Sequence, residues 1–575
     1  MNFLKSVSQF LISKEKKFII FLFILSLITS FLELAGIGMI VPLLYTFLDK
    51  ETLVQNEYII LLRDHFSLNN YNELVMFIVI IFILVIFLKS LIFTLHGYLQ
   101  LRYFSNIHIR IVKEFYKNYI YSPWSLIMNT NTAVLLRNFQ QGINDYTGKI
   151  LSYLVAFFSE IILIIVLSVF LFILYPVVSS SVFLFLGIIT FIVQRITKTF
   201  NYNLGDVRQK FNVMINKIII QSFRVPKLLK IMGKEEKFIE IFEKAVSTDT
   251  KSKYLQLFIE KLPKIWIEFI FAIIIICSLY LFINLGNEYS QLLNILIIFG
   301  LVASKLLPSV NKLLIIIQNI RYTASSVSIL KKETEKFNQE IFKISDKSQP
   351  ENLTNYEINL NNVNFKYEGS DKTIFHNLNL SIKENTSLAI IGKSGVGKST
   401  LGDLIIGVLK PNNGSVIIGD KDINGILKSW LKFIGYVPQE TYIFDDTLKK
   451  NIALGVDEDK VDEIKIKEII DILELETLTK RSKDGINLVL GDNGVKLSGG
   501  QRQRIGIARA LYINPKVLIL DESTSFLDIE TERKILTLLS NLKNKMTIIF
   551  ITHRETAKNF CDNVIDLNQI ENVSV

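Results

Sequence analysis

Long apolar runs alternate with polar, lysine-rich stretches along the chain before about Arg321. A helix that crosses a bilayer needs about 20 mostly apolar residues. Six runs are long enough to serve as spans, at about 18–47, 72–97, 151–175, 177–195, 265–284 and 291–318. Only Tyr175 and Pro176 separate the third run from the fourth, which predicts a tight hairpin between two membrane helices.

The hydropathy pattern changes after about Asn355, where shorter apolar segments alternate with polar ones as in a soluble α/β protein. The predicted organisation is therefore an α-helical transmembrane domain at 1–329, a linker at 330–355 and a soluble domain at 356–575. The first apolar run is too long for the core of a signal peptide and lacks a small-residue cleavage site, so it is predicted to be a retained span.

Lysine and arginine concentrate in three of the polar segments: the N-terminus, residues 98–150 and residues 196–264. The intervening loops are short and neutral or slightly acidic. Because basic loops remain on the cytoplasmic side, this bias predicts that both termini and the soluble domain are cytoplasmic.

Two of these basic segments have apolar residues at helical spacing, in "NIHIRIVKEFYKNYIY" and "FNVMINKIIIQSF". The spans are therefore predicted to continue beyond the bilayer as helical stalks.

Composition adds little to this picture. Half of the 575 residues are hydrophobic, and the formal net charge is +10. Such a charge is compatible with nucleic acid or with an anionic membrane face. Its placement in loops beside the spans favours the membrane, and no nucleic-acid partner is predicted. Cys277 and Cys561 lie far apart, one in an apolar run and one in the soluble part, so they are not expected to form a disulfide.

A glycine-rich loop, "GKSGVGKST", stands between a predicted strand and a predicted helix. This order is typical of a P-loop, whose backbone N–H groups and helix N-terminus bind phosphate. Lys398 is expected to reach the terminal phosphates of a nucleotide, and the Ser399 hydroxyl is expected to bind Mg²⁺. The predicted nucleotide-binding residues of the loop are Gly392, Lys393, Ser394, Gly395, Val396, Gly397, Lys398, Ser399 and Thr400.

The segment "VLILDE" is an apolar strand that ends in two carboxylates, Asp521 and Glu522. Asp521 is predicted to hold Mg²⁺ through water, and Glu522 to act as the general base that activates the attacking water. Taken alone, the segment is equally consistent with an ordinary core strand that is capped by surface acids.

Between these two motifs lies "LSGGQ", Leu497 to Gln501, and at this point the sequence resembles the ATP-binding cassette (ABC) family. Further motifs of that family follow the expected order at "VNFKYEG", "GYVPQE", "SFLD" and "FITHR". Phe526 in the third of these stands where the family usually has a small residue. The resemblance covers about 356–575.

The resemblance implies a role for each matching residue. Tyr367 would stack on adenine, Gln439 would sense Mg²⁺ and water, and His553 would contact the γ-phosphate. Ser498, Gly500 and Gln501 would contact a nucleotide held by another cassette, next to Asp528 of the D-loop. Taken alone, His553 would be interpreted as an ordinary hydrogen-bonded histidine and Tyr367 as an ordinary aromatic residue of a strand. The family roles depend on all the motifs together.

Six spans and one cassette in a single chain resemble a half-transporter of the exporter type, an α-helical membrane domain joined to an α/β P-loop ATPase domain. The resemblance implies ATP and Mg²⁺ as cofactors and a homodimer in the lipid bilayer, with a heterodimer as the alternative. Segments near Trp124 and Pro226 resemble the family's coupling helices.

Ionisable residues also occur within the apolar runs, where they are costly and usually face a cavity or a partner. Three lysines, Lys89, Lys264 and Lys305, fall on three different spans and are candidates for a cationic substrate cavity. Each could instead form a structural ion pair or reach to the membrane surface. If they converge, they suit an anionic cargo such as a diphosphate.

The membrane half resembles bacterial flippases of polyprenyl-diphosphate-linked oligosaccharides, through "SFLELAGIGMIVPLL", "LPKIWIE" and "KLLPSVNKLL". Those flippases tend to have arginine at the three lysine positions, so the charge is kept and the bidentate fork is lost. Residues 57–66 could form a short helix on the outer leaflet or a loop helix packed on the spans.

The sequence thus predicts an ATP-driven flippase of an anionic lipid-linked oligosaccharide in the bacterial cytoplasmic membrane. The alternatives are an exporter of peptides, drugs or lipid A, and a non-transporting ABC-type ATPase.

Overall fold

The structure is a computed structural model of the 575-residue chain. It describes residues 2–48, 65–66, 70–284, 289–345, 353–480, 483–523, 529–540, 542 and 545–569. Asp528 lies outside these residues, as does most of the segment 57–66, the candidate for an external helix.

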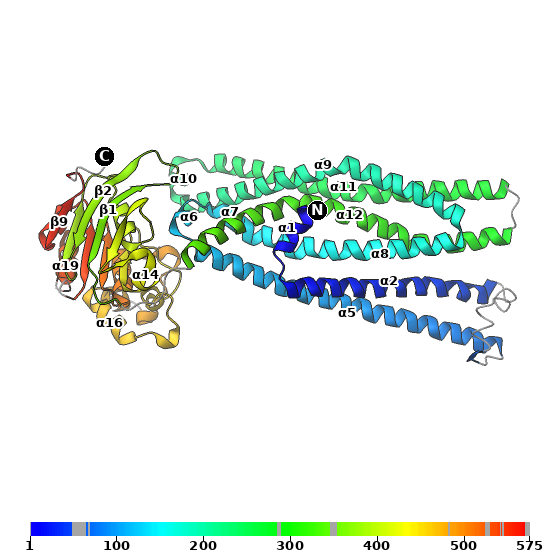
Figure 1. Ribbon diagram of the computed structural model, residues 1–575, viewed down its shortest axis with the longest axis horizontal. Helices are drawn as coiled ribbons and strands as arrows, with labels where there is room; N and C mark the ends of the chain where they lie inside the picture. Colours follow the sequence, from blue (N-terminus) through cyan, green and yellow to red (C-terminus); the bar gives the residue numbers. More distant parts are fainter. Residues whose placement is uncertain are drawn as a thin grey trace. The chain divides into compact units, whose positions relative to one another are not determined.

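Each predicted span lies within its own long helix, except that Tyr175, the last residue of the third span, falls one residue beyond its helix (Figure 1). These helices are α2 (Ser13–Leu48), α5 (Tyr71–Ile120), α8 (Leu151–Leu174), α9 (Pro176–Arg224), α11 (Glu235–Asn284) and α12 (Tyr289–Ser345). Four of them, α5, α9, α11 and α12, continue well beyond their spans, so the predicted stalks are helical. Since α12 runs to Ser345, the first part of the predicted linker is also helical.

The predicted hairpin between the third and fourth spans is present. Helix α8 ends at Leu174, and Tyr175 leaves the helical conformation with φ −140° and ψ 75°. Pro176 then occupies the first turn of α9, where a missing N–H costs nothing because that N–H would have no helical partner. The two residues therefore reverse the chain without an intervening loop.

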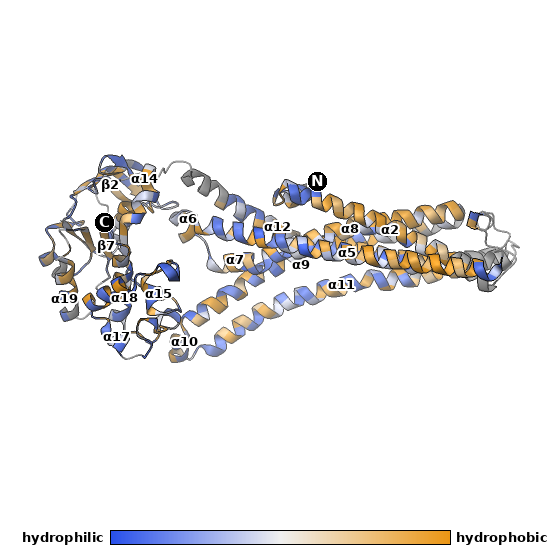
Figure 2. Ribbon diagram, turned by 90° about the horizontal axis from the view of Figure 1, so that it is seen from below, coloured by the Kyte–Doolittle hydropathy of each residue, from blue (hydrophilic) through white to orange (hydrophobic). Residues whose placement is uncertain are grey.

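Hydrophobic residues dominate α2, α8 and one end of α5, whereas hydrophilic residues become frequent along α9 and α11 toward α10 (Pro226–Met232), as Figure 2 shows. Among the described residues, 4 stretches are long and apolar enough to cross a membrane: Ser13–Ile40, Tyr71–Ile120, Thr132–Leu174 and Ile298–Phe337. The fourth and fifth predicted spans fall partly on residues whose side chains are not described.

In the helical part, α2 packs along α5 and α8, and α11 packs along α9 (Figure 1). Its core includes Leu167, Val302 and Leu314, which are fully buried. Short helices complete this part: α1 (Asn2–Gln9), α7 (Thr132–Arg137), η1 (Asn138–Gly142) and η2 (Asp145–Ile150).

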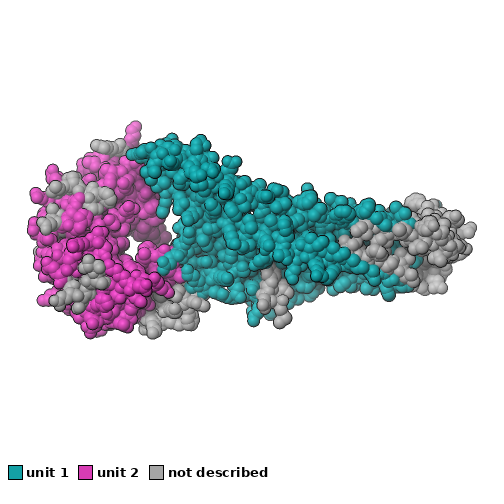
Figure 3. Space-filling view, turned by 90° about the horizontal axis from the view of Figure 1, so that it is seen from above, with its two compact units in different colours: residues 1–121, 129–339 teal, residues 122–128, 340–575 magenta. Residues whose placement is uncertain are grey.

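The chain divides into two compact units, which Figure 3 distinguishes by colour. The first comprises Met1–Tyr121 and Asn129–Gln339, and the second comprises Ser122–Met128 and Glu340–Val575. The second unit therefore includes helix α6 (Trp124–Met128), at one of the two positions predicted for coupling helices. Helix α10 is at the other position.

The second unit contains two sheets. The first is antiparallel, in the order β2 (Thr373–Ile382), β1 (Ile358–Lys366), β4 (Asn413–Ile418), β5 (Lys421–Asp422). The second is parallel, in the order β6 (Ile434–Val437), β7 (Val517–Asp521), β8 (Thr547–Ile551), β3 (Ser387–Ile391), β9 (Asn563–Asp566).

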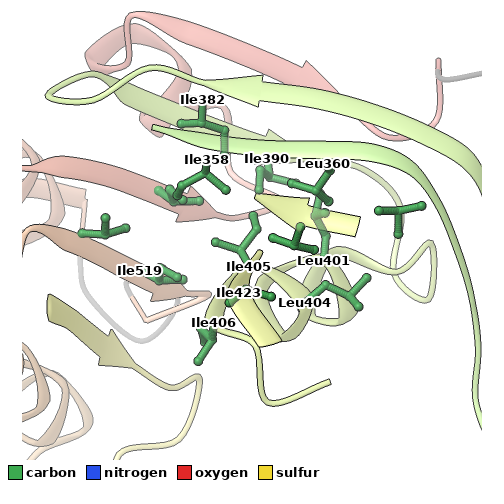
Figure 4. Close-up of a cluster of buried hydrophobic side chains, with 14 of the residues drawn as sticks. Ile358, Leu360, Ile382, Ile390, Leu401, Leu404, Ile405, Ile406, Ile423 and Ile519 are labelled. Carbon is green, nitrogen blue, oxygen red and sulfur yellow. The ribbon is translucent and has the colours of Figure 1, made fainter. Parts of the chain in front are cut away.

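Every residue of β3, β7 and β8 is buried, as expected for parallel strands covered on both faces. Ile390 of β3 and Ile519 of β7 pack with Leu401 of α13 and with Ile358 and Leu360 of β1 (Figure 4). The helices of this unit are α13 (Lys398–Ile406), α14 (Ile423–Trp430), α15 (Leu448–Ile452), α16 (Glu463–Ile472), α17 (Glu476–Lys480), α18 (Gly499–Tyr512) and α19 (Ile529–Ser540).

Candidate functional site

Four candidate segments of the soluble unit lie at the carboxyl ends of four neighbouring parallel strands. The P-loop follows β3, Gln439 follows β6, Glu522 follows β7 and His553 follows β8. Ligands of open parallel sheets bind at this edge, because the strands end there and the following loops converge. Segments separated by more than a hundred residues thus meet at one site.

The P-loop has a backbone conformation that depends on glycine at specific places. Gly395 and Gly397 have φ of 82° and 106°, in the left-handed region that other residues rarely adopt. A Cβ on Gly397 would lie 2.6 Å from Cγ2 of Ile374. The loop therefore closes tightly against β2 before α13 begins at Lys398.

Lys398 is almost fully buried within this loop. Its ammonium donates hydrogen bonds to the carbonyl oxygens of Gly392 at 3.0 Å and Lys393 at 3.1 Å. These carbonyls hold the Lys398 ammonium at the N-terminus of α13. The positive charge of the ammonium and the dipole of the helix both favour a bound anion there. A buried ammonium at a helix N-terminus fits a phosphate group.

Asp521 lies beside the hydroxyl of Ser399, as the two motifs predicted. Ser399 Oγ donates to Asp521 Oδ1 at 3.2 Å, and the Tyr436 hydroxyl lies 3.4 Å from Asp521 Oδ2. Burial raises the pKa of Asp521, and burial together with Asp521 raises the pKa of Asp403 to about 6. The Asp521 carboxylate and the Ser399 hydroxyl, in a partly buried position, are suitable oxygen donors for Mg²⁺.

No group of three or more His, Cys, Asp or Glu side chains in the described part of the chain could by itself hold a metal ion.

Glu522 lies at the centre of the candidate polar residues. Its Oε2 accepts a hydrogen bond from Gln439 Nε2 at 2.9 Å, and its Oε1 lies 3.7 Å from both Lys398 Nζ and His553 Nδ1. Its φ is +46°, an unusual value for a residue with a side chain, and its N–H donates to the carbonyl of Ile551 at 2.8 Å. Strained residues of this kind concentrate at functional sites.

Tyr367 lies just after β1 and reaches the P-loop helix. Its hydroxyl and that of Thr400 are 3.0 Å apart, and its ring packs edge-on against Phe365. The predicted adenine-stacking residue is thus beside the P-loop, with a partly buried ring.

The signature residues form the start of α18. Ser498 Oγ accepts from the N–H of Gln501 at 3.2 Å, and Gln501 Oε1 accepts from the N–H of Ser498 at 2.9 Å. This capping box satisfies two backbone donors at the helix N-terminus. Gly500 lies in the same first turn.

Sequence reasoning missed Asp403 and Tyr436. A signal for Asp403 was available, because it follows Ser399 by one helical turn and so shares its face of α13. Tyr436 gave no such signal, since it reaches Asp521 only through the pairing of β6 with β7.

The charged residues of the helical unit form ion pairs. Lys89 and Lys305 both pair with Glu33, the latter at 3.1 Å. Lys264 pairs with Glu268 on its own helix at 3.9 Å. Two of the three candidate cavity lysines are therefore brought together, and a carboxylate lies between them, whereas the third has a carboxylate of its own.

Comparison with known families accounts for both units. The ABC transporter transmembrane region matches residues 18–303, and the ABC transporter cassette matches residues 375–525. The chain belongs to the ABC transporter family. It is a membrane protein with the organisation of an ABC exporter half-transporter, a helical membrane domain and a nucleotide-binding domain, which confirms the predicted fold class.

Several ABC proteins are similar to this chain over part of their length. A Rickettsia typhi protein named as an export ATP-binding/permease protein is 41% identical over 214 residues, 37% of each chain. The lactococcin-A transport/processing ATP-binding protein of Lactococcus lactis is 37% identical over 38% of this chain and 30% of its own. The leukotoxin translocation ATP-binding protein of Mannheimia glucosida is 28% identical over 61% of this chain and 49% of its own. The chain thus matches less than half the length of each of these relatives.

A solved structure of a bacterial Atm1-family ABC exporter with ATP bound covers 93% of this chain and 94% of its own, with a TM-score of 0.75. At 20% identity, this similarity shows the fold of an ABC exporter.

Proposed function

We propose that this ABC transporter hydrolyses ATP and uses the energy to export a cargo across the membrane. The observation that carries the proposal is the convergence of Lys398, Asp521 and Glu522 at one edge of the cassette sheet, in a chain with six long helices. ABC relatives named for export support the same conclusion.

Each residue at the sheet edge has a role in this proposal. Lys398 and the P-loop N–H groups bind and orient the triphosphate, and Tyr367 contacts the adenine. Mg²⁺ held by Ser399, Asp521 and Gln439 would neutralise charge on the phosphate oxygens. Glu522 accepts a proton from the attacking water, and Gln439 and His553 hold the Glu522 carboxylate and the γ-phosphate in position.

The active assembly is proposed to be a dimer. Ser498, Gly500 and Gln501 of one cassette, with Asp528 beside them, would meet the nucleotide held by Lys398 of the other. Both the signature and Glu522 are intact in this chain, so two copies would form two competent sites, which favours a homodimer. A heterodimer is the alternative.

The proposed location is the bacterial cytoplasmic membrane, with both termini and the cassette in the cytoplasm. The support is the lysine and arginine bias of the polar segments.

The proposed cargo is an anionic lipid-linked oligosaccharide of the polyprenyl-diphosphate type. Supporting it, Lys89 of α5 and Lys305 of α12 both reach the same point on α2. With Glu33 they carry a formal net charge of +1, which favours an anion. Lys264 is left out of this proposal, because it pairs with Glu268 on its own helix rather than with Glu33.

A peptide or protein cargo is the second candidate. Two relatives are named for lactococcin-A and leukotoxin, and they are matched over 38% and 61% of this chain.

The deciding experiment places the purified chain in liposomes with a fluorescent polyprenyl-diphosphate oligosaccharide. We expect ATP-dependent flipping, which falls strongly in Lys89→Ala and Lys305→Ala while basal ATP hydrolysis persists. Flipping that survives both substitutions, or stimulation of ATP hydrolysis by peptide alone, would favour the second candidate.

A further inference from the structure

A pocket lies between α11 and α12, and the proposed cargo does not account for it. It has a volume of about 400 Å³ and is lined by Lys264, Ile267, Glu268, Ala303, Ser304, Leu307, Pro308 and Asn311. This volume lies within the range of about 300–1,000 Å³ that is typical of small-molecule sites.

One wall of the pocket has opposite charges at a fixed spacing. Lys264 and Glu268 are one turn apart on α11, with their charged atoms separated by 3.9 Å. Their side chains are 63% and 59% exposed, so both charges can reach a ligand. Glu268 would repel a ligand that carries only negative charge. Lys264 would repel a ligand that carries only positive charge. The pair therefore suits a ligand that carries both charges.

The other wall offers hydrogen-bond acceptors. Asn311 Oδ1 is buried and has no hydrogen-bond donor among the described residues. Pro308, inside α12, has no N–H, so the carbonyl of Ser304 one turn earlier loses its helical hydrogen bond. An unsatisfied buried acceptor is costly, and a ligand with N–H donors would satisfy it.

The location of the pocket indicates an amphiphilic ligand. Lys264 immediately precedes the fifth predicted span, at one boundary of the membrane. Ile267, Ala303 and Leu307 add apolar surface next to the charged pair.

We propose that this pocket binds a primary-ammonium zwitterion, with Lys264 contacting its anionic group and Glu268 and Asn311 accepting N–H bonds from its ammonium group. The ligand chemistry is that of an ethanolamine phosphate, present either in the headgroup of a phospholipid or as a free solute. This site does not depend on the cargo proposed above.

The test compares two lipids that differ only at the ammonium group, where three N–H donors in one are replaced by three methyl groups in the other. Fluorescent short-chain phosphatidylethanolamine and the phosphatidylcholine with identical chains are titrated against nucleotide-free protein in neutral detergent. We expect the ethanolamine lipid to bind about tenfold more tightly, the effect of one hydrogen bond to a charged group.

Three variants separate the contribution of the two residues that accept N–H bonds from that of the lysine that contacts the phosphate. Glu268→Gln and Asn311→Leu should remove most of the preference for the ethanolamine lipid. Lys264→Gln should weaken both lipids and leave their ratio unchanged, because both carry the same phosphate. Lys261→Gln is the matched control, since it removes an exposed lysine from the same helix outside the pocket lining. Elution volume and thermal unfolding confirm that each variant is folded.

Equal binding of the two lipids by the unmodified protein would overturn the proposal, as would a preference that survives both Glu268→Gln and Asn311→Leu. Competition by glycerophosphoethanolamine assigns the site to the headgroup alone. Retention of the lipid preference without such competition assigns it to the membrane lipid. Because no nucleotide or transport is involved, a failure here leaves the export proposal untouched.

Discussion

The cassette and the membrane domain each contain a cluster around a glutamate, and the two clusters differ in origin. In the cassette, Lys398 is held by carbonyls five and six residues earlier in the chain. In the membrane domain, Glu33, Lys89 and Lys305 come from three helices. The setting of Lys398 follows from a contiguous motif, although Glu522 approaches it only through the sheet, whereas the membrane cluster arises only through helix packing.

The clusters also differ in how their charges are balanced. Neutral carbonyls hold Lys398, so its charge remains available for phosphate, with Glu522 at 3.7 Å. Lys89 and Lys305 share the Glu33 carboxylate, which is only 13% exposed. Part of their positive charge is therefore neutralised by an ion pair between packed helices. A lysine in an apolar run can therefore contribute to helix packing as well as to the proposed cargo site, and substitutions can separate the two.

The largest expected effect is on the cassette side. Glu522→Gln keeps the shape of the side chain and removes the base, so ATP hydrolysis should fall by about 10²–10⁴-fold while ATP binding persists. Turnover and nucleotide binding are measured on the same preparation. Near-normal turnover would show that Glu522 does not accept the proton.

The P-loop backbone should show the next largest effect. Gly397→Ala adds a Cβ that would lie 2.6 Å from Ile374, at a φ of 106°. Gly395→Ala is the matched control, since its φ is 82° and no atom lies within 4 Å of the added Cβ. Backbone strain should cost each variant about 1–3 kcal/mol, and overpacking should cost Gly397→Ala about 1–3 kcal/mol more. Thermal unfolding of the cassette measures the difference, and equal losses would contradict the steric explanation.

The membrane cluster should respond to loss of its carboxylate. Glu33→Gln leaves two lysines without a counter-charge, and should lower the stability of the helical unit by about 1–3 kcal/mol. The ATPase activity of the folded fraction should change little. Glu33→Gln combined with Lys89→Gln should recover part of the loss, and no recovery would indicate that the ion pair contributes little to packing.

The smallest expected effect concerns Tyr367. Tyr367→Phe keeps the ring and removes the hydrogen bond to Thr400, at a cost of about 0.5–1.5 kcal/mol in cassette stability. If the ring stacks on adenine, the affinity for ATP should stay close to normal in Tyr367→Phe and fall in Tyr367→Ala. An equal fall in both variants would point to the hydroxyl instead.

Much of the architecture was predictable because it depends on local patterns. Apolar runs of membrane-spanning length placed the six long helices, and Tyr175–Pro176 placed the hairpin. The order strand, glycine loop, helix placed the P-loop, because positive φ and a helix N-terminus are properties of neighbouring residues. Membership of the ABC transporters follows from the same local motifs, and the family matches confirm it.

The remaining features depended on tertiary structure. Tyr436 contacts Asp521, and Asp403 interacts with it electrostatically, because α13, β6 and β7 meet at one edge of the sheet. Likewise, one glutamate pairs with two of the candidate lysines, while the third lysine faces a pocket of its own. A sequence specifies which residues are charged and how far apart they lie along the chain. Which charges neutralise each other is decided by helix packing, because electrostatic attraction depends on distance in space.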